Sequence, residues 1–355
     1  MIAALDVELP ASLSEHIAQL MADMARFDAR MDTCGYNLPA LLLRSESSAS
    51  SQIENLTSSV RNVALAELSD DAPNNAVLIA GNVAAMREAL EVPVSCTVES
   101  LKRVHKALVE PTGQSFGGEL RDEQVWIGGT PYSPHGASYV APRWERVSAL
   151  LDDLCAFCER DDINPVAQAA IAHAQFENIH PFVDGNGRCG RALIHRQLAF
   201  NTALRCGGLP ISVGLLHDSD RYFAALSAYR EGNALAIVEE LADAIEIALS
   251  IGGAAVSKIE VLLDSWHELI EERKGSAIHK LPELLVEQPV VDAEYVASKL
   301  GISDRMARNV LARAGEYGIV RQLGSARRNR LFQADELLDI LEDISAKDAM
   351  RRVLR

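Results

Sequence analysis

The chain has 355 residues, a formal net charge of −16 and 48% hydrophobic residues. This ordinary globular composition excludes a wholly disordered or fibrous chain, and the length predicts two or three domains of ~100–200 residues each. The acidic charge argues against a protein that coats nucleic acid over its whole surface, although it allows a local basic patch.

The sequence gives no sign of membrane insertion or export. No apolar run approaches the ~20 residues that a membrane-spanning helix needs, and residues 1–6 lack the basic and apolar regions of an export signal. We therefore expect a cytoplasmic protein with reduced thiols. Cys155 and Cys158 have the spacing of a metal knuckle, but no second pair accompanies them, so we expect buried thiols and not zinc.

Helical periodicity dominates the chain. Helices are predicted over residues 13–24, 75–90, 97–109, 144–159, 165–179, 188–201, 221–230 and 235–250. The one clear break is the Gly- and Pro-rich stretch of residues 113–142, where the apolar segments 125–127 and 139–140 predict a β-hairpin. The fold class is therefore mainly α, with a single hairpin in the helical core.

The C-terminal segment is organised differently. Three short helices are predicted at residues 281–287, 293–300 and 305–314, followed by two strands at 319–320 and 331–332 around a basic loop. This order is typical of a winged helix-turn-helix. The predicted domains are an N-terminal helical region at 1–95, a core at 96–245, a helical connector at 246–280, the winged helix at 281–342 and a tail at 343–355.

Basic residues are concentrated in this winged helix. Residues 299–330 contain eight basic and two acidic residues, which gives a local charge of +6. Such a patch is typical of contact with the DNA backbone. A winged helix that binds a protein or forms a dimer is an equally good interpretation. The basic residues are Lys299, Arg305, Arg308, Arg313, Arg321, Arg327, Arg328 and Arg330.

The most informative stretch is residues 180–191, which read His-Pro-Phe-Val-Asp-Gly-Asn-Gly-Arg-Cys-Gly-Arg. Three of them adopt positive φ readily, so their N–H groups can point into one concavity at the start of the next helix. Arg188 and Arg191 share one face of that helix and can bind further phosphate oxygens. The spacing predicts an anion-binding loop. The three residues are Gly185, Asn186 and Gly187.

Two further residues of this loop suggest chemistry. Asp184 offers a hard oxygen ligand that suits Mg²⁺ between phosphates, and His180 can take a proton from a hydroxyl near neutral pH. A core histidine followed by a glycine turn is the simpler interpretation, but it is improbable for this whole set within twelve residues.

The twelve residues match every fixed position of the Fic-family signature His-Pro-Phe-x-Asp/Glu-Gly-Asn-Gly-Arg-x-x-Arg. Residues 172–179 also look like the helix that leads into the Fic loop. Ser50, Glu54 and Asn55 resemble the family's inhibitory motif, Ser/Thr-x-x-x-Glu-Gly/Asn. The resemblance covers about the first 245 residues and makes residues 96–245 a Fic-type helical core.

The resemblance implies that the chain transfers AMP from ATP to a Ser, Thr or Tyr hydroxyl of a protein, itself included, and releases pyrophosphate. It implies that His180 deprotonates the hydroxyl and that Asp184 holds Mg²⁺ across the α- and β-phosphates. The amides of residues 185–187 and the guanidinium of Arg188 would steady the phosphates, and Arg191 would bind the γ-phosphate.

The predicted hairpin resembles the family's flap, which clamps the segment to be modified. A free strand edge can pair with an extended peptide through main-chain hydrogen bonds. The alternative to this docking role is a strand that only packs against the rest of the protein, above all through its tryptophan. The flap residues are Trp126, Ile127, Gly128 and Gly129.

Ser50 and Glu54 lie four residues apart and are expected on one helix face. Alone, Glu54 would be interpreted as a solvated surface acid. The resemblance implies that Glu54 pairs with Arg191 and so bars a productive ATP pose, which makes the isolated chain autoinhibited. Tyr222 and Tyr229 either line an adenine pocket or pack in the core.

Other functions stay open at this point. The same fold can remove AMP or transfer another phosphate-containing group, and a DNA-binding regulator can use a nucleotide site only to sense ATP. Apolar faces on the long helices also permit a homodimer.

Overall fold

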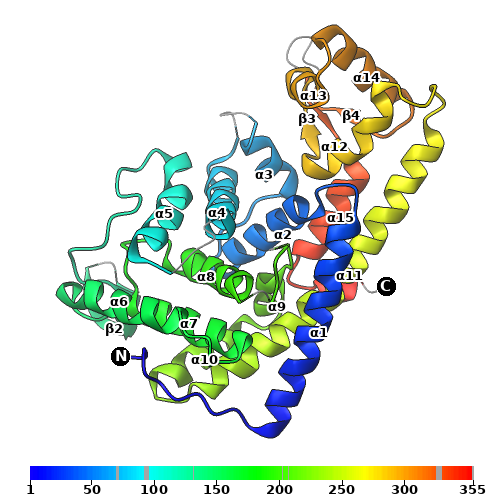
Figure 1. Ribbon diagram of the computed structural model, residues 1–355. Helices are drawn as coiled ribbons and strands as arrows, with labels where there is room; N and C mark the ends of the chain where they lie inside the picture. Colours follow the sequence, from blue (N-terminus) through cyan, green and yellow to red (C-terminus); the bar gives the residue numbers. More distant parts are fainter. Residues whose placement is uncertain are drawn as a thin grey trace.

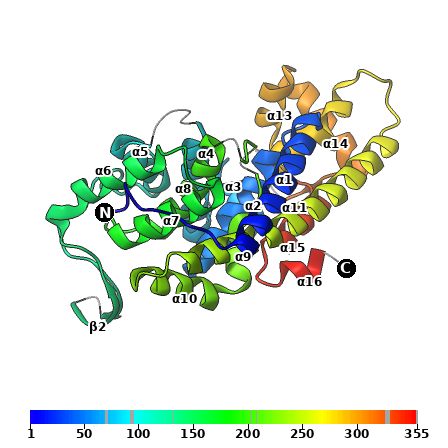
Figure 2. The same cartoon turned by 60° about the horizontal axis from the view of Figure 1, so that its bottom comes forward.

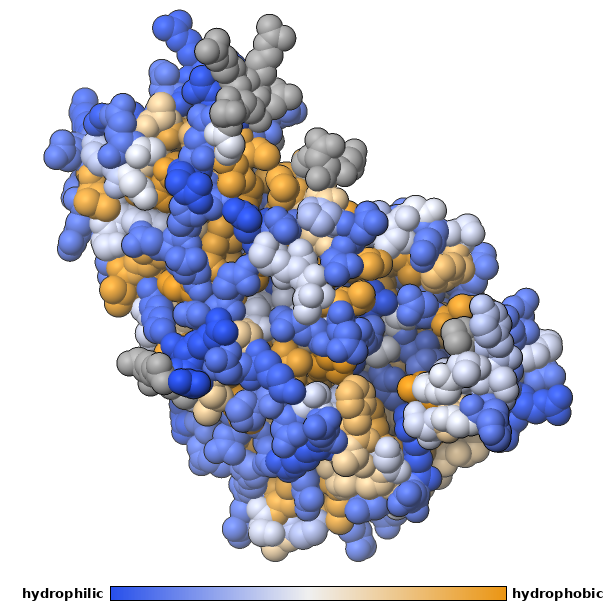
Figure 3. Space-filling model, turned by 180° about the vertical axis from the view of Figure 1, so that it is seen from behind, coloured by the Kyte–Doolittle hydropathy of each residue, from blue (hydrophilic) through white to orange (hydrophobic). Residues whose placement is uncertain are grey.

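The computed structural model describes residues 1–68, 72–91, 96–130, 132–201, 203–206, 208–324 and 330–353. Helices form the body of the molecule, with a C-terminal module at one end and a β-hairpin that projects at the other (Figures 1 and 2). None of the described helices is long and apolar enough to cross a membrane. Hydrophobic residues on the face drawn in Figure 3 form several separate groups among hydrophilic ones.

The centre of the core is the helix pair that flanks the predicted anion-binding loop, α7 (Pro165–Ile179) and α8 (Asn186–Phe200). The α7 helix is buried on nearly all sides, because alanines and other apolar residues occur all round it. Its first turn is capped by Asn164, whose side chain accepts from two backbone N–H groups. The neighbouring helices are α4 (Asn74–Glu91), α5 (Val98–Val109) and α6 (Val147–Cys158).

Two long helices run side by side toward the C-terminal module, α1 (Ala11–Thr33) and α11 (Leu235–Leu269) (Figure 1). The α11 helix continues without a break past residue 245, where we placed the end of the core. Gly252, inside α11, lies against the ring of Phe27 of α1, so the absence of a side chain there allows a close approach. The short helices α9 (Ile211–His217) and α10 (Ser219–Arg230) pack on α11.

The α2 helix (Leu38–Ile53) lies between the core and the C-terminal module, and it contacts both. On the core side, the buried carboxylate of Glu46 accepts from the backbone and hydroxyl of Ser212 and lies 3.1 Å from His195 Nε2. On the other side, Arg44 donates to the carbonyl of Glu287 at 2.7 Å. The helix is therefore fixed from both sides.

The predicted hairpin is confirmed. It consists of β1 (Trp126–Thr130) and β2 (Ser133–Val140), which pair antiparallel in a sheet of two strands, so within the described part of the chain one edge of β1 has no strand beside it. Its base is held against the core: the Tyr139 hydroxyl donates to the carbonyl of Asn178, and the Arg230 guanidinium lies 4.0 Å from the Tyr139 ring centroid.

The C-terminal module contains α12 (Leu281–Glu287), α13 (Ala293–Leu300) and α14 (Asp304–Glu316), close to the three predicted helices. Its sheet has the strand order β3-β5-β4. The strands are β3 (Val290–Val291), β4 (Arg321–Gln322) and β5 (Phe332–Gln333).

Several short elements were not predicted, because strands of two residues and helices of five to seven carry little periodic signal. They are β3, α3 (Val60–Ala66), α9 and α16 (Ala349–Val353). In addition, α15 (Asp335–Ser345) extends past residue 342, the predicted end of the winged-helix domain. Three 3-10 turns lie at Glu110–Thr112, Trp144–Arg146 and Ala277–Lys280. Arg327 and Arg328 of the predicted wing lie outside the described residues.

The crossing of α9 over α11 gives a stability test. A Cβ built at Gly214 would overlap the backbone carbonyl of Ala244, so Gly214→Ala forces two packed helices apart. We expect this variant to lose about 2 kcal/mol of unfolding free energy, measured by urea denaturation. Gly253→Ala is the control, because nothing lies within 4 Å of its Cβ, and it should be neutral or gain about 0.5 kcal/mol. Equal stability of both variants would contradict the packing described here.

Candidate functional site

His180 is held in a fixed orientation at the end of α7. It is the C-cap residue and adopts a left-handed conformation, φ 49° and ψ 61°. Its Nδ1 lies 3.3 Å from the carbonyl oxygen of Glu177, which can only accept, so this contact places the ring proton on Nδ1 and leaves the lone pair on Nε2. Burial lowers the pKa of His180 to about 4, which keeps the ring neutral at pH 7.

The loop after His180 is closed by Asn186. Its side-chain oxygen accepts from the backbone N–H of Phe182, and its amide nitrogen donates to the carbonyl of the same residue, both at 2.9 Å. Asn186 therefore shapes the loop with its side chain, whereas any contact with an anion falls to its backbone. The first amides of α8, at residues 186–188, have no carbonyl one turn earlier in the helix to bond. This helix end therefore has the free donors that an anion-binding end requires.

An anion already lies beside this helix end, the carboxylate of Glu54. Its two oxygens lie 3.0 Å from Arg188 Nε and 2.7 Å from Arg191 Nη2. A Cβ built at Gly187 would overlap Oε1 of Glu54, so the absence of a side chain at this glycine leaves space for the carboxylate. Both arginine side chains are at most 4% exposed. The expected pair of Glu54 with Arg191 is present, and Arg188 joins it.

Ser50 completes the contact to Arg191. The Arg191 guanidinium donates to the hydroxyl of Ser50 and to its carbonyl, each at 2.8 Å. Glu54 differs slightly from the expectation, because α2 ends at Ile53 and Glu54 is the C-cap residue, followed by Asn55 in a left-handed conformation (φ 62°). The chain turns here, and this turn directs the carboxylate toward α8.

Asp184 lies at the outer side of the loop. Its side chain is 68% exposed, and one carboxylate oxygen lies 3.6 Å from Arg188 Nη2. An accessible carboxylate next to an anion-binding helix end fits Mg²⁺, which binds proteins through one or two carboxylates and takes other oxygens from phosphates and water.

Two residues that the sequence did not single out hold the loop in place. The buried Arg121 donates to the carbonyls of His180 and Glu123, at 2.7 and 2.8 Å, and so links the loop of His180 to the segment that leads into the hairpin. A lone arginine in a turn carries no pattern that would reveal this role.

The second is His105. Its ring stacks on Phe182, with centroids 3.7 Å apart and planes 7° apart. Its Nδ1 accepts from the N–H of Gly118 at 2.9 Å, so Nε2 carries the proton and donates to the carbonyl of Asp184 at 3.1 Å. Burial lowers the pKa of His105 to about 4, so this neutral tautomer persists at pH 7.

Two tyrosines and four flap residues remain from the candidates of the sequence analysis. Tyr222 is buried and bonds His173 at 2.8 Å, and Tyr229 donates to Gln175 at 3.0 Å, contacts that fit core packing. Trp126 is half-buried, and its indole N–H donates to the carbonyl of Thr130 within its own strand. The other predicted flap residues, Ile127, Gly128 and Gly129, are exposed along β1.

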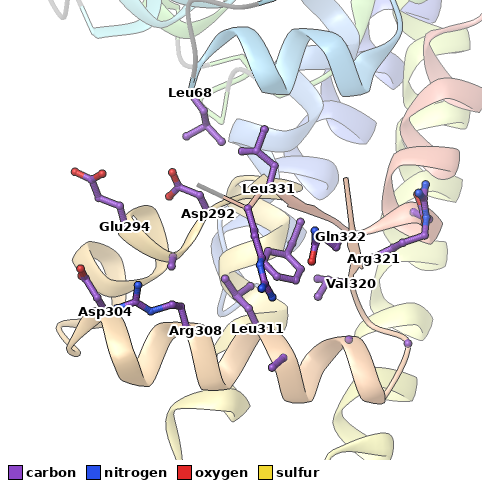
Figure 4. Close-up of a pocket in the computed structure, with 17 residues that line it drawn as sticks. Leu68, Asp292, Glu294, Asp304, Arg308, Leu311, Val320, Arg321, Gln322 and Leu331 are labelled. Atoms are coloured by element: carbon purple, nitrogen blue, oxygen red, sulfur yellow. The ribbon is translucent and has the colours of Figure 1, made fainter. Parts of the chain in front are cut away.

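A groove of about 1190 Å³ lies elsewhere, in the C-terminal module between α13, α14 and the strands β4 and β5 (Figure 4). The lining residues include the bases Arg308, Arg321 and Arg330 and the acids Asp292, Glu294, Asp304 and Asp335. Three of the basic residues counted in the sequence are neutralised by ion pairs, Lys299 with Glu287, Arg313 with Glu272 and Arg321 with Asp335. The charge of this groove is therefore close to balanced, which weakens the electrostatic argument for DNA.

The role of Asn186 in the loop can be tested by stability. Asn186→Ala leaves the buried N–H and carbonyl of Phe182 without partners, which should cost about 2 kcal/mol or more of unfolding free energy. Urea denaturation measures the loss, and the exposed Asn309→Ala should stay within about 0.5 kcal/mol of the parent. A parent-like Asn186→Ala protein would contradict this description of the loop.

Comparison with known proteins finds one family. Residues 95–198 match the Fic/DOC family. A curated relative in Drosophila melanogaster, named protein adenylyltransferase Fic, is 30% identical over 158 residues, which are 44% of this chain and 30% of that protein. The relative of the same name in Drosophila virilis is 28% identical over 194 residues, 53% of this chain and 38% of that protein. The chain thus spans about a third of the length of these relatives.

Solved structures share the fold. A Fic family protein from Desulfovibrio desulfuricans superimposes with a TM-score of 0.60 at 21% identity, over 92% of this chain and 97% of that one. Fic-1 from C. elegans gives a TM-score of 0.51 at 18% identity, over 69% of this chain and 74% of that one. Residues 95–198, which include the loop of His180, thus form a Fic/DOC domain, and these solved structures share the helical fold of the chain.

Proposed function

We propose that this chain is an ATP- and Mg²⁺-dependent protein adenylyltransferase whose own Glu54 keeps the nucleotide out. The observation that carries the proposal is the carboxylate of Glu54 held between Arg188 and Arg191 at the start of α8. This contact supports an anion site beside His180. It also supports autoinhibition, because a carboxylate that is bound to Arg188 and Arg191 keeps a phosphate from binding them.

The donors suit phosphate oxygens. Guanidinium groups and helix N-terminal amides both favour oxyanions, and the bonds are stronger where water is excluded. When Glu54 leaves, two nearly buried arginines lose their counter-charge, which costs several kcal/mol unless another anion replaces it. The phosphates of ATP are such a replacement.

The neutral ring of His180 supports the chemistry. Its Nε2 takes the proton of a Ser, Thr or Tyr hydroxyl of the target as the oxygen forms a bond to the α-phosphorus. The bond from that phosphorus to the pyrophosphate oxygen breaks in the same displacement, and pyrophosphate leaves with its electron pair. The amides at 186–188 and Arg188 stabilise the charge that develops.

Asp184 is the residue that would hold Mg²⁺, and the ion would neutralise charge on the phosphates. The position of the carboxylate, exposed at the outer side of the loop, supports this assignment.

The free edge of β1 supports docking of the target. Its exposed residues 127–130 can pair with an extended segment of another protein and so bring a hydroxyl to His180. Hydrogen bonds from Arg121 and Tyr139 tie this hairpin to the helix that ends at His180, so a docked segment has a fixed position relative to the base.

The first test removes the inhibitory anion. Glu54→Gly should raise AMP transfer and self-labelling from α-labelled ATP at least tenfold, because a charge-assisted bond of about 1.5–3 kcal/mol no longer opposes the nucleotide. Glu231→Gly is the matched control: Glu231 is an exposed C-cap residue of α10, and its loss should leave transfer unchanged.

The same assay separates the other functions. Adding His180→Ala to the Glu54→Gly protein should abolish labelling. Labelling that survives this change would contradict the proposed base, and release of AMP from a labelled protein without transfer would favour AMP removal. Nucleotide binding without labelling in either protein would favour an ATP sensor.

The metal assignment is tested separately. In the Glu54→Gly background, Asp184→Asn should raise the Mg²⁺ concentration for half-maximal transfer at least tenfold, because the loop then offers a neutral ligand. Chelation with EDTA should stop transfer in both proteins. Asp161→Asn, at an exposed loop position, serves as the control and should behave as the parent. An unchanged Mg²⁺ dependence of Asp184→Asn would remove the assignment.

A further inference from the structure

A buried carboxyl group lies next to His180 and is used neither by the loop nor by the proposed nucleotide site. Glu177 is 5% exposed, one turn before His180 on α7. Its Oε2 lies 3.9 Å from His180 Nδ1, the same nitrogen that contacts the backbone carbonyl of Glu177 at 3.3 Å. The ring nitrogen opposite the reacting one thus faces two oxygens of a single residue.

The fold makes room for this carboxyl group. A Cβ built at Gly190 of α8 would lie 2.8 Å from Glu177 Oε1, so any larger residue there would push the carboxyl group away. Oε1 has no hydrogen-bond partner within the described part of the chain. A buried polar atom without a partner is costly, and such groups in native structures often have a chemical role.

Several charged or titratable groups surround Glu177. Burial raises the pKa of its carboxyl group to about 7; the Glu54 charge acts in the same direction, and the charges of Arg191 and Arg230 oppose it. At neutral pH the group therefore exchanges between its acid and its carboxylate. The groups that face it are His173 on α7 and His180 at its end, Cys189 and Arg191 on α8, Tyr222 and Arg230 on α10, Tyr139 on β2, and Glu54 after α2.

We propose that Glu177 is a positioning residue for His180: its carboxylate, 3.9 Å from Nδ1, stabilises by its charge the imidazolium that forms when Nε2 takes the proton of the target hydroxyl. This inference rests on the proposed AMP transfer. One proton moves, from the hydroxyl oxygen to Nε2, and the Nδ1 proton stays on the ring. Pyrophosphate leaves as described above, and the proton later leaves Nε2 for solvent or product.

The carboxylate form is the active one in this scheme, which predicts a pH dependence. In the Glu54→Gly protein, kcat/KM should rise with pH through an inflexion somewhat below 7, because the charge of Glu54 no longer raises the pKa of Glu177. Glu177→Gln should lower kcat about 10- to 100-fold and remove this inflexion. Glu177→Asp, which keeps a carboxylate, should retain it.

Glu240 offers a matched control. It is a buried glutamate of α11, 3.0 Å from Arg221, and burial raises the pKa of its carboxyl group to about 7 as well. Glu240→Gln should leave the pH profile unchanged. A merely structural role of Glu177 would lower activity equally at every pH and keep the inflexion, and that result would overturn the inference.

A second measurement needs no activity. In the full chain with ¹³C-labelled histidine, the ring resonances of His180, assigned with His180→Ala, should shift near pH 7 although the ring itself gains no proton there. Glu177→Gln should remove this shift, and Glu240→Gln should not. If the shift persists in Glu177→Gln, the inference is wrong. Absence of AMP transfer in every variant, with the resonance shift present, would sink the proposed function and not the contact.

Discussion

The site depends on one electrostatic requirement: two nearly buried arginines at the start of α8 need an anion. Arg188 and Arg191 have little contact with water, so their charges must be balanced by groups of the protein or of a ligand. In this structure the Glu54 carboxylate bonds both, and Asp184 lies 3.6 Å from Arg188. Because a carboxylate and a phosphate satisfy the same donors, the proposed function makes this contact the one that a nucleotide must replace.

The position of Glu54 depends in turn on how α2 is held. The helix is fixed to the core through Glu46, and its last turn is fixed to the C-terminal module by Gln52, which donates to the carbonyl of Ser345 at 2.9 Å. The segment that follows bonds the same module, since the N–H of Val60 donates to Glu342 at 2.6 Å. A rotation of the Glu54 side chain, which is 27% exposed, would therefore remove its carboxylate from both arginines, whereas Ser50 on α2 would still bond Arg191.

The loop of residues 180–187, in contrast, is held by several contacts. Asn186 closes it from within, His105 stacks beneath it and Arg121 ties it to the hairpin. Each of these contacts ends on a backbone N–H or carbonyl, or on the ring of Phe182, so none of them involves the groups that would bind an anion. In the proposed function, such preorganised amides and arginines would stabilise developing charge without reorganisation.

The sequence by itself determined the helical class, the hairpin and the loop of residues 180–191, because periodicity, glycine content and a dense local motif are all short-range signals. It also pointed to Glu54 and Ser50, but only through resemblance to a family motif. Tertiary structure alone decided that Arg188 shares the Glu54 carboxylate, that α2 bridges the core and the C-terminal module, and that Glu177, His105 and Arg121 surround the loop. These contacts join residues up to 293 positions apart, as in the bond from Gln52 to Ser345, and no local pattern encodes such pairs. The net charge of the basic patch in the C-terminal module could not be predicted from the sequence either, since it depends on which arginines form ion pairs with carboxylates after folding.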